Sequence, residues 1–331
     1  MKNFLFSVLI TVFSSFTGES GLHHTDKLDE IFDIGTVQSL IIQKNGTVIA
    51  EKYRGRINGN LPVNIKSASK SVLSLLVGIA IEEGYLEGVH QTLGDFFPEY
   101  FEDKPDPVKE SVTIKDLLTM RSGLETTSFM NYGRWVMSNN WVYFTLNQPL
   151  AGTPGEAMIY STGTSHLLSA IITRASGMST LEFGNRYLFR PMGIRIGGWD
   201  QDPQGYYMGG NNMAMSPLDL VKIGELMMNV GKYNGRQLVS REWILESVEI
   251  YTKSNFNPYH YGYMWWRKQS AGYEVFFAWG NGGQYIMILP ELDTVISITS
   301  SLSTSNSRRY QREIFQFLGD VIIPAIKNHP G

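Results

Sequence analysis

The chain has no cysteine among its 331 residues. Disulfides, thiol nucleophiles, thiolate metal sites and lipid attachment through an N-terminal cysteine are therefore excluded. The six histidines are scattered, with only His23 and His24 adjacent, and neither H-E-x-x-H nor a comparable ligand spacing occurs. We therefore expect no catalytic metal, and the fold must be stabilised by packing.

The chain also lacks a large excess of either charge, since its net charge is -3 and no basic or acidic run occurs. Without a basic footprint we expect no binding to nucleic acid or to other charged polymers. With 43% hydrophobic and 12% aromatic residues, the chain can bury a large core in one large domain or two small ones.

Long hydrophobic runs are missing except near the start of the chain, where residues 4–16 follow a lysine. This stretch is too short to span a bilayer and ends in small polar residues, as a cleavage region would. We expect residues 1–20 to be a signal peptide and the mature protein to be periplasmic or secreted. A buried first helix or a short membrane anchor is the alternative. No later segment reaches spanning length, so we expect no stable membrane insertion after cleavage.

The ends of the chain carry strand patterns. Residues 38–43 and 47–53 are β-rich and joined by Lys44-Asn45-Gly46, and Asn-Gly is a strong hairpin signal. Four more strands, expected at 261–266, 273–278, 285–289 and 294–299, would complete one antiparallel sheet with that hairpin. The amphipathic tail at 308–327 is expected to cover a face of this sheet.

The middle of the chain, from Ser69 to about Ile194, has mostly helical spacing, with Thr113 as one helix cap. Another helix is expected at 217–228, capped by Ser216. We therefore expect one α/β domain of the α+β kind at 21–331. Its sheet subdomain would take about 25–66 and 230–331, and its helical subdomain about 67–229.

Ser67 and Lys70 form the only S-x-x-K in the chain, at the start of an apolar run. Positions three apart share one face of a helix, so the hydroxyl and the amine can come within hydrogen-bonding distance. A helix N-terminus and burial both disfavour an ammonium, so a neutral Lys70 could accept the proton of Ser67. The alternative is a Ser67 that only caps the helix beside a solvated Lys70.

Four motifs together resemble the serine hydrolases that share the fold of class C β-lactamases, penicillin-binding proteins and related esterases. The resemblance covers nearly all of the mature chain. The motifs are Ser67-x-x-Lys70, Thr113-Ile114-Lys115-Asp116-Leu117-Leu118-Thr119-Met120-Arg121-Ser122-Gly123-Leu124, Pro154-Gly155 leading to Tyr160-Ser161-Thr162-Gly163, and Trp279-Gly280-Asn281-Gly282-Gly283-Gln284. The resemblance implies the β-lactamase/transpeptidase-like fold, with its sheet flanked by N- and C-terminal helices.

The same resemblance implies that Tyr160 shares the base role with Lys70, which would keep its phenol partly deprotonated. The family has Asn two residues after this tyrosine, whereas Thr162 stands here. What the family calls its third motif is Lys-Thr-Gly in β-lactamases, and the residues that match it here, Trp279 to Gln284, are a Gly-rich variant. A backbone N–H of Asn281 or Gly282 could join that of Ser67 in an oxyanion hole. The structural alternative for Tyr160 is an ordinary tyrosine of the core, and the alternative for the glycines is a tight bend of the strand.

In β-lactamases the Asn and the Lys that are missing here would bind the amide and the carboxylate of the lactam, so efficient β-lactamase activity is disfavoured. The resemblance is closer to esterases, oligomer-amide hydrolases, including 6-aminohexanoate-dimer hydrolases, and D-amino-acid peptidases. Tyr132 and Asn212, in segments suited to a lid and a pocket wall, are candidate substrate-binding residues. Ordinary core and loop roles are the alternative for both.

We therefore predict a serine hydrolase that cleaves a small-molecule or short peptide ester or amide through a Ser67 acyl-enzyme, without a cofactor. We expect a monomer or dimer. The alternatives are an exported, catalytically weak protein that binds peptide or peptidoglycan fragments, and a D-Ala-D-Ala carboxypeptidase or β-lactamase.

Overall fold

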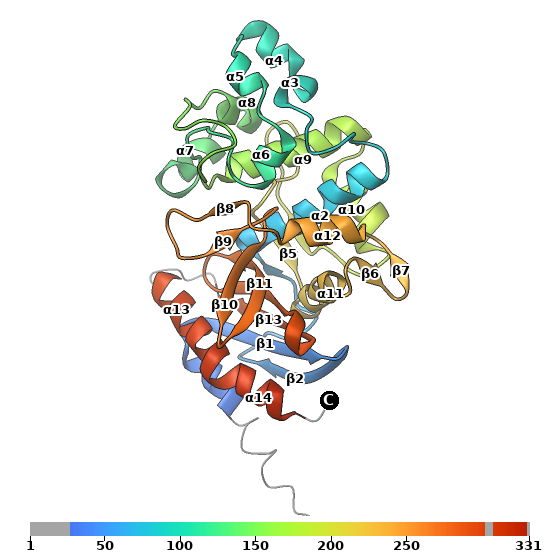
Figure 1. Cartoon of the computed structure of the whole chain (residues 1–331), viewed down its shortest axis with the longest axis vertical. Coiled ribbons are helices and arrows are strands. Elements are labelled where there is room, and N and C mark those ends of the chain that lie inside the picture. The colour runs from blue at the N-terminus through green and yellow to red at the C-terminus, as the bar shows by residue number, and fades with distance from the viewer. Residues whose placement is uncertain (1–26, 302–306, 330–331) are drawn as a thin grey trace, which may run out of the picture.

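The architecture of the chain is that of a computed structural model, which describes residues 27–301 and 307–329. An antiparallel sheet with flanking helices forms the lower part of the molecule, and a mostly helical part lies above it (Figure 1). The expected signal peptide at 1–20 lies outside the described residues. No helix among the described residues is long and apolar enough to cross a membrane.

The main sheet has eight strands in the order β2-β1-β13-β12-β11-β10-β9-β8, and every neighbouring pair is antiparallel. It joins the first and last parts of the described chain, as the sequence predicts. Both residues of the tight turn between β1 and β2, Asn45 and Gly46, have positive φ, as a two-residue hairpin turn requires. The strands are β1 (Val37–Lys44), β2 (Thr47–Tyr53), β8 (Thr252–Lys253), β9 (His260–Tyr261), β10 (Trp266–Ser270), β11 (Tyr273–Gly280), β12 (Gln284–Leu289) and β13 (Thr294–Ser300).

One expected strand, at 261–266, is wrong. β9 ends at Tyr261 and β10 begins at Trp266, because the residues between them make a tight turn in which Met264 has a φ of +63°. The Met264 N–H donates to Leu118 O, and the Ser71 hydroxyl donates to Met264 O. This turn is therefore held by the helical part of the molecule instead of by a neighbouring strand.

Helices cover both faces of the sheet. On one face α11 (Pro217–Met228), capped by Ser216 as expected, packs Val221 against Ile41 and Val295. On the other face the C-terminal segment packs Phe315 against the rings of Phe277 and Tyr285. This segment comprises α13 (Ser307–Phe317), η6 (Leu318–Ile322) and α14 (Ile323–Asn328), and η1 (Lys27–Asp33) contacts it.

The helical part surrounds α2 (Ser69–Glu82), in which every residue from Ser69 to Ala80 is buried. The apolar run that follows Ser67 is thus a core helix. α12 (Arg241–Ser247) packs the Trp243 ring on Gly78 of α2. The other helices and turns are η2 (Lys66–Ala68), α3 (Leu93–Phe96), α4 (Pro98–Asp103), α5 (Pro107–Glu110), α6 (Ile114–Leu118), η3 (Phe129–Asn131), α7 (Tyr132–Val136), α8 (Trp141–Leu146), α9 (Thr162–Ser176), α10 (Thr180–Gly184), η4 (Asn185–Phe189) and η5 (Pro290–Leu292).

Two small sheets complete the fold, β3 (Val63–Asn64), β5 (Met213–Met215) and β4 (Gly198–Trp199) in one, and β6 (Lys232–Tyr233) with β7 (Arg236–Gln237) in the other. β3 leads directly into η2, which carries Ser67. α11 falls within the 67–229 range expected for the helical subdomain, yet it packs on the main sheet.

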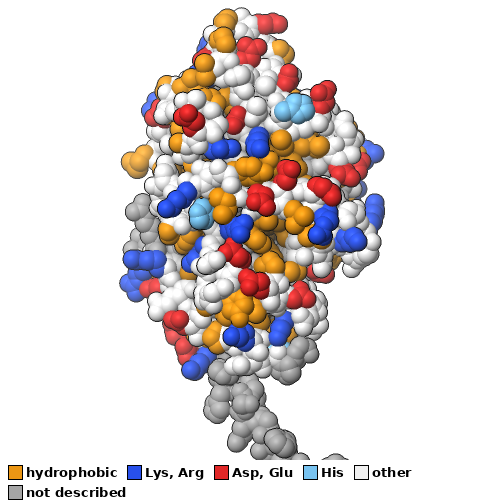
Figure 2. Space-filling model, in the orientation of Figure 1, with side chains coloured by type: hydrophobic (Ala, Val, Ile, Leu, Met, Phe, Trp, Pro, Cys, Tyr) orange, Lys and Arg blue, Asp and Glu red, His pale blue; other side chains and the backbone are white. Residues whose placement is uncertain are grey.

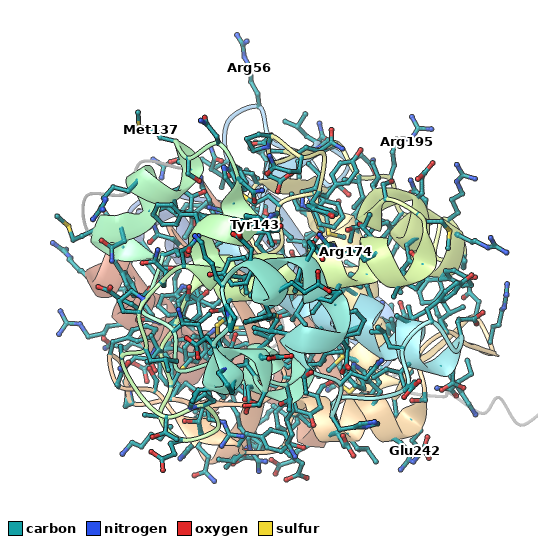
Figure 3. The ribbon with its side chains drawn as sticks, turned by 90° about the horizontal axis from the view of Figure 1, so that it is seen from above. Arg56, Met137, Tyr143, Arg174, Arg195 and Glu242 are labelled. Carbon is teal, nitrogen blue, oxygen red and sulfur yellow. The ribbon has the colours of Figure 1, made fainter. Side chains whose placement is uncertain are left out.

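Arg174 fixes the C-terminal half of α9 within the helical part. Its guanidinium donates to Glu99 at 2.7 Å and to Phe96 O at 2.6 Å. In the view from above, Arg174 and Tyr143 lie near the centre, whereas Met137 lies at the rim (Figure 3). α9, whose first residue Thr162 belongs to the motif of Tyr160, is thus held firmly at its other end.

Candidate active site

Ser67 lies in η2, immediately before α2, and Lys70 lies in the first turn of α2. The two elements continue one helical path, so the side chains three positions apart meet, with Lys70 Nζ 3.2 Å from Ser67 Oγ. Lys66 has a φ of +53°, and its N–H donates to the Asn64 side chain at 2.9 Å. The chain therefore turns sharply just before the serine.

Lys70 is buried, with 1% of its surface exposed. Its amine donates to Gly210 O at 2.6 Å and lies 3.3 Å from Thr162 Oγ1. Burial lowers the pKa of Lys70 from 10.5 to about 7, because a buried ammonium loses its hydration. Near neutral pH a substantial fraction of Lys70 is an uncharged amine that can accept a proton.

Tyr160 lies two residues before α9, and its ring centre is 5.1 Å from Lys70 Nζ. Its hydroxyl hydrogen-bonds to Ser67, which lowers its pKa, but burial outweighs this and raises the pKa of Tyr160 to about 12. The expected partly deprotonated phenol is therefore wrong. A phenolate at this position would lose its hydration, and this cost exceeds what the hydrogen bond with Ser67 returns.

Thr162, which stands where the family has asparagine, contacts Lys70. The Thr162 hydroxyl also lies 2.9 Å from Ser128 Oγ, which accepts the Thr162 N–H at 2.8 Å. Sequence reasoning recorded only the loss of the amide and missed both hydroxyls. The spacing of Thr162 from Tyr160 was the available signal, whereas no sequence signal marks Ser128.

The third motif lies beside η2 at the end of β11. Gly280 packs so closely on Ile65 O that no Cβ would fit, which brings the glycine-rich turn next to the serine. Asn281 is exposed in this turn, and Gly282 follows with a φ of +89°. The role of the Asn281 or Gly282 N–H as second oxyanion donor stays a prediction.

The two candidate substrate-binding residues belong to one polar network. The Tyr132 hydroxyl accepts a hydrogen bond from Asn211 at 2.8 Å, and burial raises its pKa. Asn212 contacts Asn64 at 3.0 Å and donates to Asp200 at 2.8 Å, so it supports the residues that precede the serine. Their contact with a substrate stays a prediction.

Aromatic rings surround Tyr160. The Phe256 ring lies 5.7 Å from it, the Phe129 ring 6.3 Å and the Trp266 ring 6.0 Å. Phe129 is 64% exposed, so part of this group, which we call the aromatic wall, is open to solvent. Within 27–301 and 307–329 no group of three or more His, Asp or Glu side chains could hold a metal ion.

Known proteins were compared with this chain. The family model described as Beta-lactamase matches residues 35–320. The 6-aminohexanoate-dimer hydrolase of Paenarthrobacter ureafaciens is 23% identical over 318 residues, covering 86% of this chain and 77% of the relative. Among solved structures, a Bacillus anthracis protein assigned as a 6-aminohexanoate-dimer hydrolase superposes with a TM-score of 0.75 at 20% identity, covering 92% of this chain and 83% of that one.

A second solved structure, EstCE1, is described as a hydrolase with promiscuous acyltransferase activity. It superposes with a TM-score of 0.72 at 17% identity, covering 91% of this chain and 99% of that one. The architecture and the nucleophile–amine pair define a serine hydrolase of the β-lactamase and penicillin-binding-protein fold. The chain belongs to the beta-lactamase family.

Proposed function

We propose that this protein hydrolyses a carboxylic ester or amide through an acyl-enzyme on Ser67. The observation that carries the proposal is the Ser67 hydroxyl 3.2 Å from the buried amine of Lys70. A neutral amine has two N–H groups and one lone pair. The Gly210 carbonyl can only accept, and Thr162 Oγ1 can also accept, so these two partners leave the lone pair for Ser67.

In the proposed reaction, Lys70 accepts the proton as Ser67 Oγ attacks the substrate carbonyl. The Ser67 N–H and that of Asn281 or Gly282 stabilise the oxyanion. Tyr160, which is neutral because of its raised pKa, donates its proton to the leaving group and recovers one from the Lys70 ammonium. Water then attacks the acyl carbon while the neutral Lys70 amine takes a proton from it, the bond to Ser67 Oγ breaks, and Lys70 returns that proton to Ser67 as the acid leaves.

The side chains that are missing from two of the motifs bear on the class of substrate. Thr162 stands where the family has asparagine, and no lysine occurs between Trp279 and Gln284. The side chains that would bind the amide and the carboxylate of a β-lactam are therefore missing. Relatives named as a 6-aminohexanoate-dimer hydrolase and a hydrolase with acyltransferase activity support a small-molecule or short peptide ester or amide.

The test is intact-mass spectrometry of the mature protein after exposure to a fluorophosphonate, p-nitrophenyl acetate and, separately, penicillin G. We expect one adduct on Ser67 with the first two reagents. In Ser67→Ala we expect p-nitrophenyl acetate turnover to fall by about 10⁴-fold or more with the fold intact. Unchanged turnover in Ser67→Ala would refute the mechanism.

The alternative functions predict different results with these three reagents. A stable penicillin adduct with rapid D-Ala-D-Ala cleavage would favour a carboxypeptidase, and fast penicillin turnover a β-lactamase. No adduct with any reagent in a folded sample would favour a protein that only binds peptide or peptidoglycan fragments.

We also propose that the protein is exported and that residues 1–20 are removed. The charged start and the short apolar stretch support this proposal. N-terminal sequencing of protein from the expressing cell's extracytoplasmic fraction tests it, and an intact Met1 on cytoplasmic protein would contradict it.

A further inference from the structure

His166 and Asp202 form a buried pair that the proposed chemistry does not use. Neither side chain has any exposed surface, and His166 Nε2 lies 3.0 Å from Asp202 Oδ2. His166 is one turn after Thr162 on α9, so both side chains project from the same face of that helix. Trp135 and Trp141 pack against the imidazole, with ring centres 5.7 and 5.5 Å away.

The hydrogen bonds of His166 define its tautomer. The Gly209 N–H donates to Nδ1 at 3.2 Å, so Nδ1 carries no proton. The proton is therefore on Nε2, which donates to Asp202. The other carboxylate oxygen of Asp202 accepts the N–H groups of Gln204 and Tyr206, both at 2.9 Å. The neutral imidazole thus connects Asp202, which is held by its bonds to residues 204 and 206, to the backbone N–H of Gly209.

The next residue, Gly210, contacts Lys70 directly. Gly210 accepts the hydrogen bond of the Lys70 amine at 2.6 Å, and its φ is +109°. A Cβ on Gly209 would lie 2.6 Å from His166 Cα, and one on Gly210 would lie 2.6 Å from Lys70 Cγ. Only glycine permits the segment to lie between α9 and Lys70, so its position depends on what holds it.

We propose that His166 and Asp202 are positioning residues that set the Lys70 amine against Ser67 by holding the backbone at Gly209, next to the Gly210 carbonyl that binds Lys70. The Gly209 N–H bond to His166, together with the bond from the Ser165 hydroxyl to the Gly209 carbonyl, holds the chain at the residue directly before the Gly210 carbonyl. That carbonyl takes one N–H of Lys70 and so directs the lone pair to the serine. The inference rests on the proposed acyl-enzyme function.

The experiment measures single-turnover acylation by p-nitrophenyl acetate, with KM and thermal stability, in four variants. In His166→Asn the side-chain oxygen lies near the Nδ1 position and can accept the Gly209 N–H. In His166→Gln the amide reaches toward Asp202 and leaves that N–H unpaired. His166→Ala removes both bonds. Ser169→Ala is the matched control, because Ser169 is also buried on α9 and donates to Tyr207 O at 2.6 Å.

We expect His166→Ala and His166→Gln to slow acylation by about 10- to 100-fold with little change in KM, since a small displacement of a catalytic group costs this much. His166→Asn is expected to recover most of the rate. Ser169→Ala is expected to lose stability without slowing acylation.

Two results would overturn the proposal: equal rates in His166→Asn and His166→Gln, or equal slowing in Ser169→Ala and the His166 variants. If His166→Ala does not fold, the comparison of the Asn and Gln variants still decides. Failure of the proposed function itself would appear as no Ser67 adduct in the unsubstituted protein. In that case a crystal structure of His166→Gln that keeps Gly210 O at 2.6 Å from Lys70 Nζ would refute the positioning role.

Discussion

In the proposed mechanism, Lys70 sets the pH range in which Ser67 can be acylated. Burial lowers the pKa of Lys70 to about 7, and the base must be neutral, so kcat/KM for p-nitrophenyl acetate should rise with pH through about 7 and then level off. The raised pKa of Tyr160 keeps the phenol protonated across this range. A pH profile of acylation measures this, after correction for spontaneous ester hydrolysis. A rate that stays constant from pH 5 to 9 would contradict the assignment.

The hydroxyl of Thr162 contacts the Lys70 amine at 3.3 Å. Thr162→Val keeps the shape but removes the acceptor, and we expect acylation to slow by about tenfold, the effect of losing one hydrogen bond to a reacting group. Thr164→Val is the control, because Thr164 is also buried on α9 and its hydroxyl contacts Ser122 instead. Equal rates in the two variants would show that Thr162 is only structural.

At the scale of elements, the segment between β8 and β9 brings Phe256 into the aromatic wall next to Tyr160. We expect Phe256→Ala to lower kcat/KM for p-nitrophenyl benzoate by about 2- to 10-fold relative to p-nitrophenyl acetate, because one aromatic contact contributes about 0.5–1.5 kcal/mol. Phe276→Ala is the control, since that ring on β11 lies under Arg267. An unchanged benzoate-to-acetate ratio would mean that the acyl group binds elsewhere.

α9 is the element on which the site depends most. Its start carries Thr162 close to Lys70, its next turn carries His166, and its last turn is tied to Glu99 through Arg174. The sheet contributes the turn after β11. The candidate site therefore lies where the helical part meets the sheet.

At the scale of the whole molecule, the C-terminal helices stabilise the sheet but lie outside the chemistry. Phe315 is 6% exposed and packs on Phe277, Tyr285 and Tyr259. Phe315→Ala should lower the free energy of unfolding by about 3–5 kcal/mol while folded protein acylates at the normal rate. Urea unfolding of this variant beside the exposed Gln316→Ala measures it. A slowed acylation in folded Phe315→Ala would show that the far face of the sheet supports the site.

The visible surface has no region of one charge. Lys and Arg side chains are interspersed with Asp and Glu across the face shown in Figure 2. This mixture agrees with the small net charge of -3.

Local signals in the sequence predicted several elements correctly. Asn45 and Gly46 define a hairpin, and Ser216 with Pro217 begins α11, because turn and capping preferences act within a few residues. The S-x-x-K spacing predicted the Ser67–Lys70 contact for the same reason, since three positions on one helix suffice.

The surroundings of Lys70 depended on the tertiary structure alone. Its partners Thr162 and Gly210 are 92 and 140 positions away along the chain, so no local pattern could reveal them. The same long-range packing broke the expected strand at 261–266 and raised the pKa of Tyr160. The sequence by itself determined the contact between Ser67 and Lys70 and the hairpin and helix starts, because these follow from short-range geometry. Burial and the polar groups around the amine come from segments that only folding brings together, so the tertiary structure decided the protonation states.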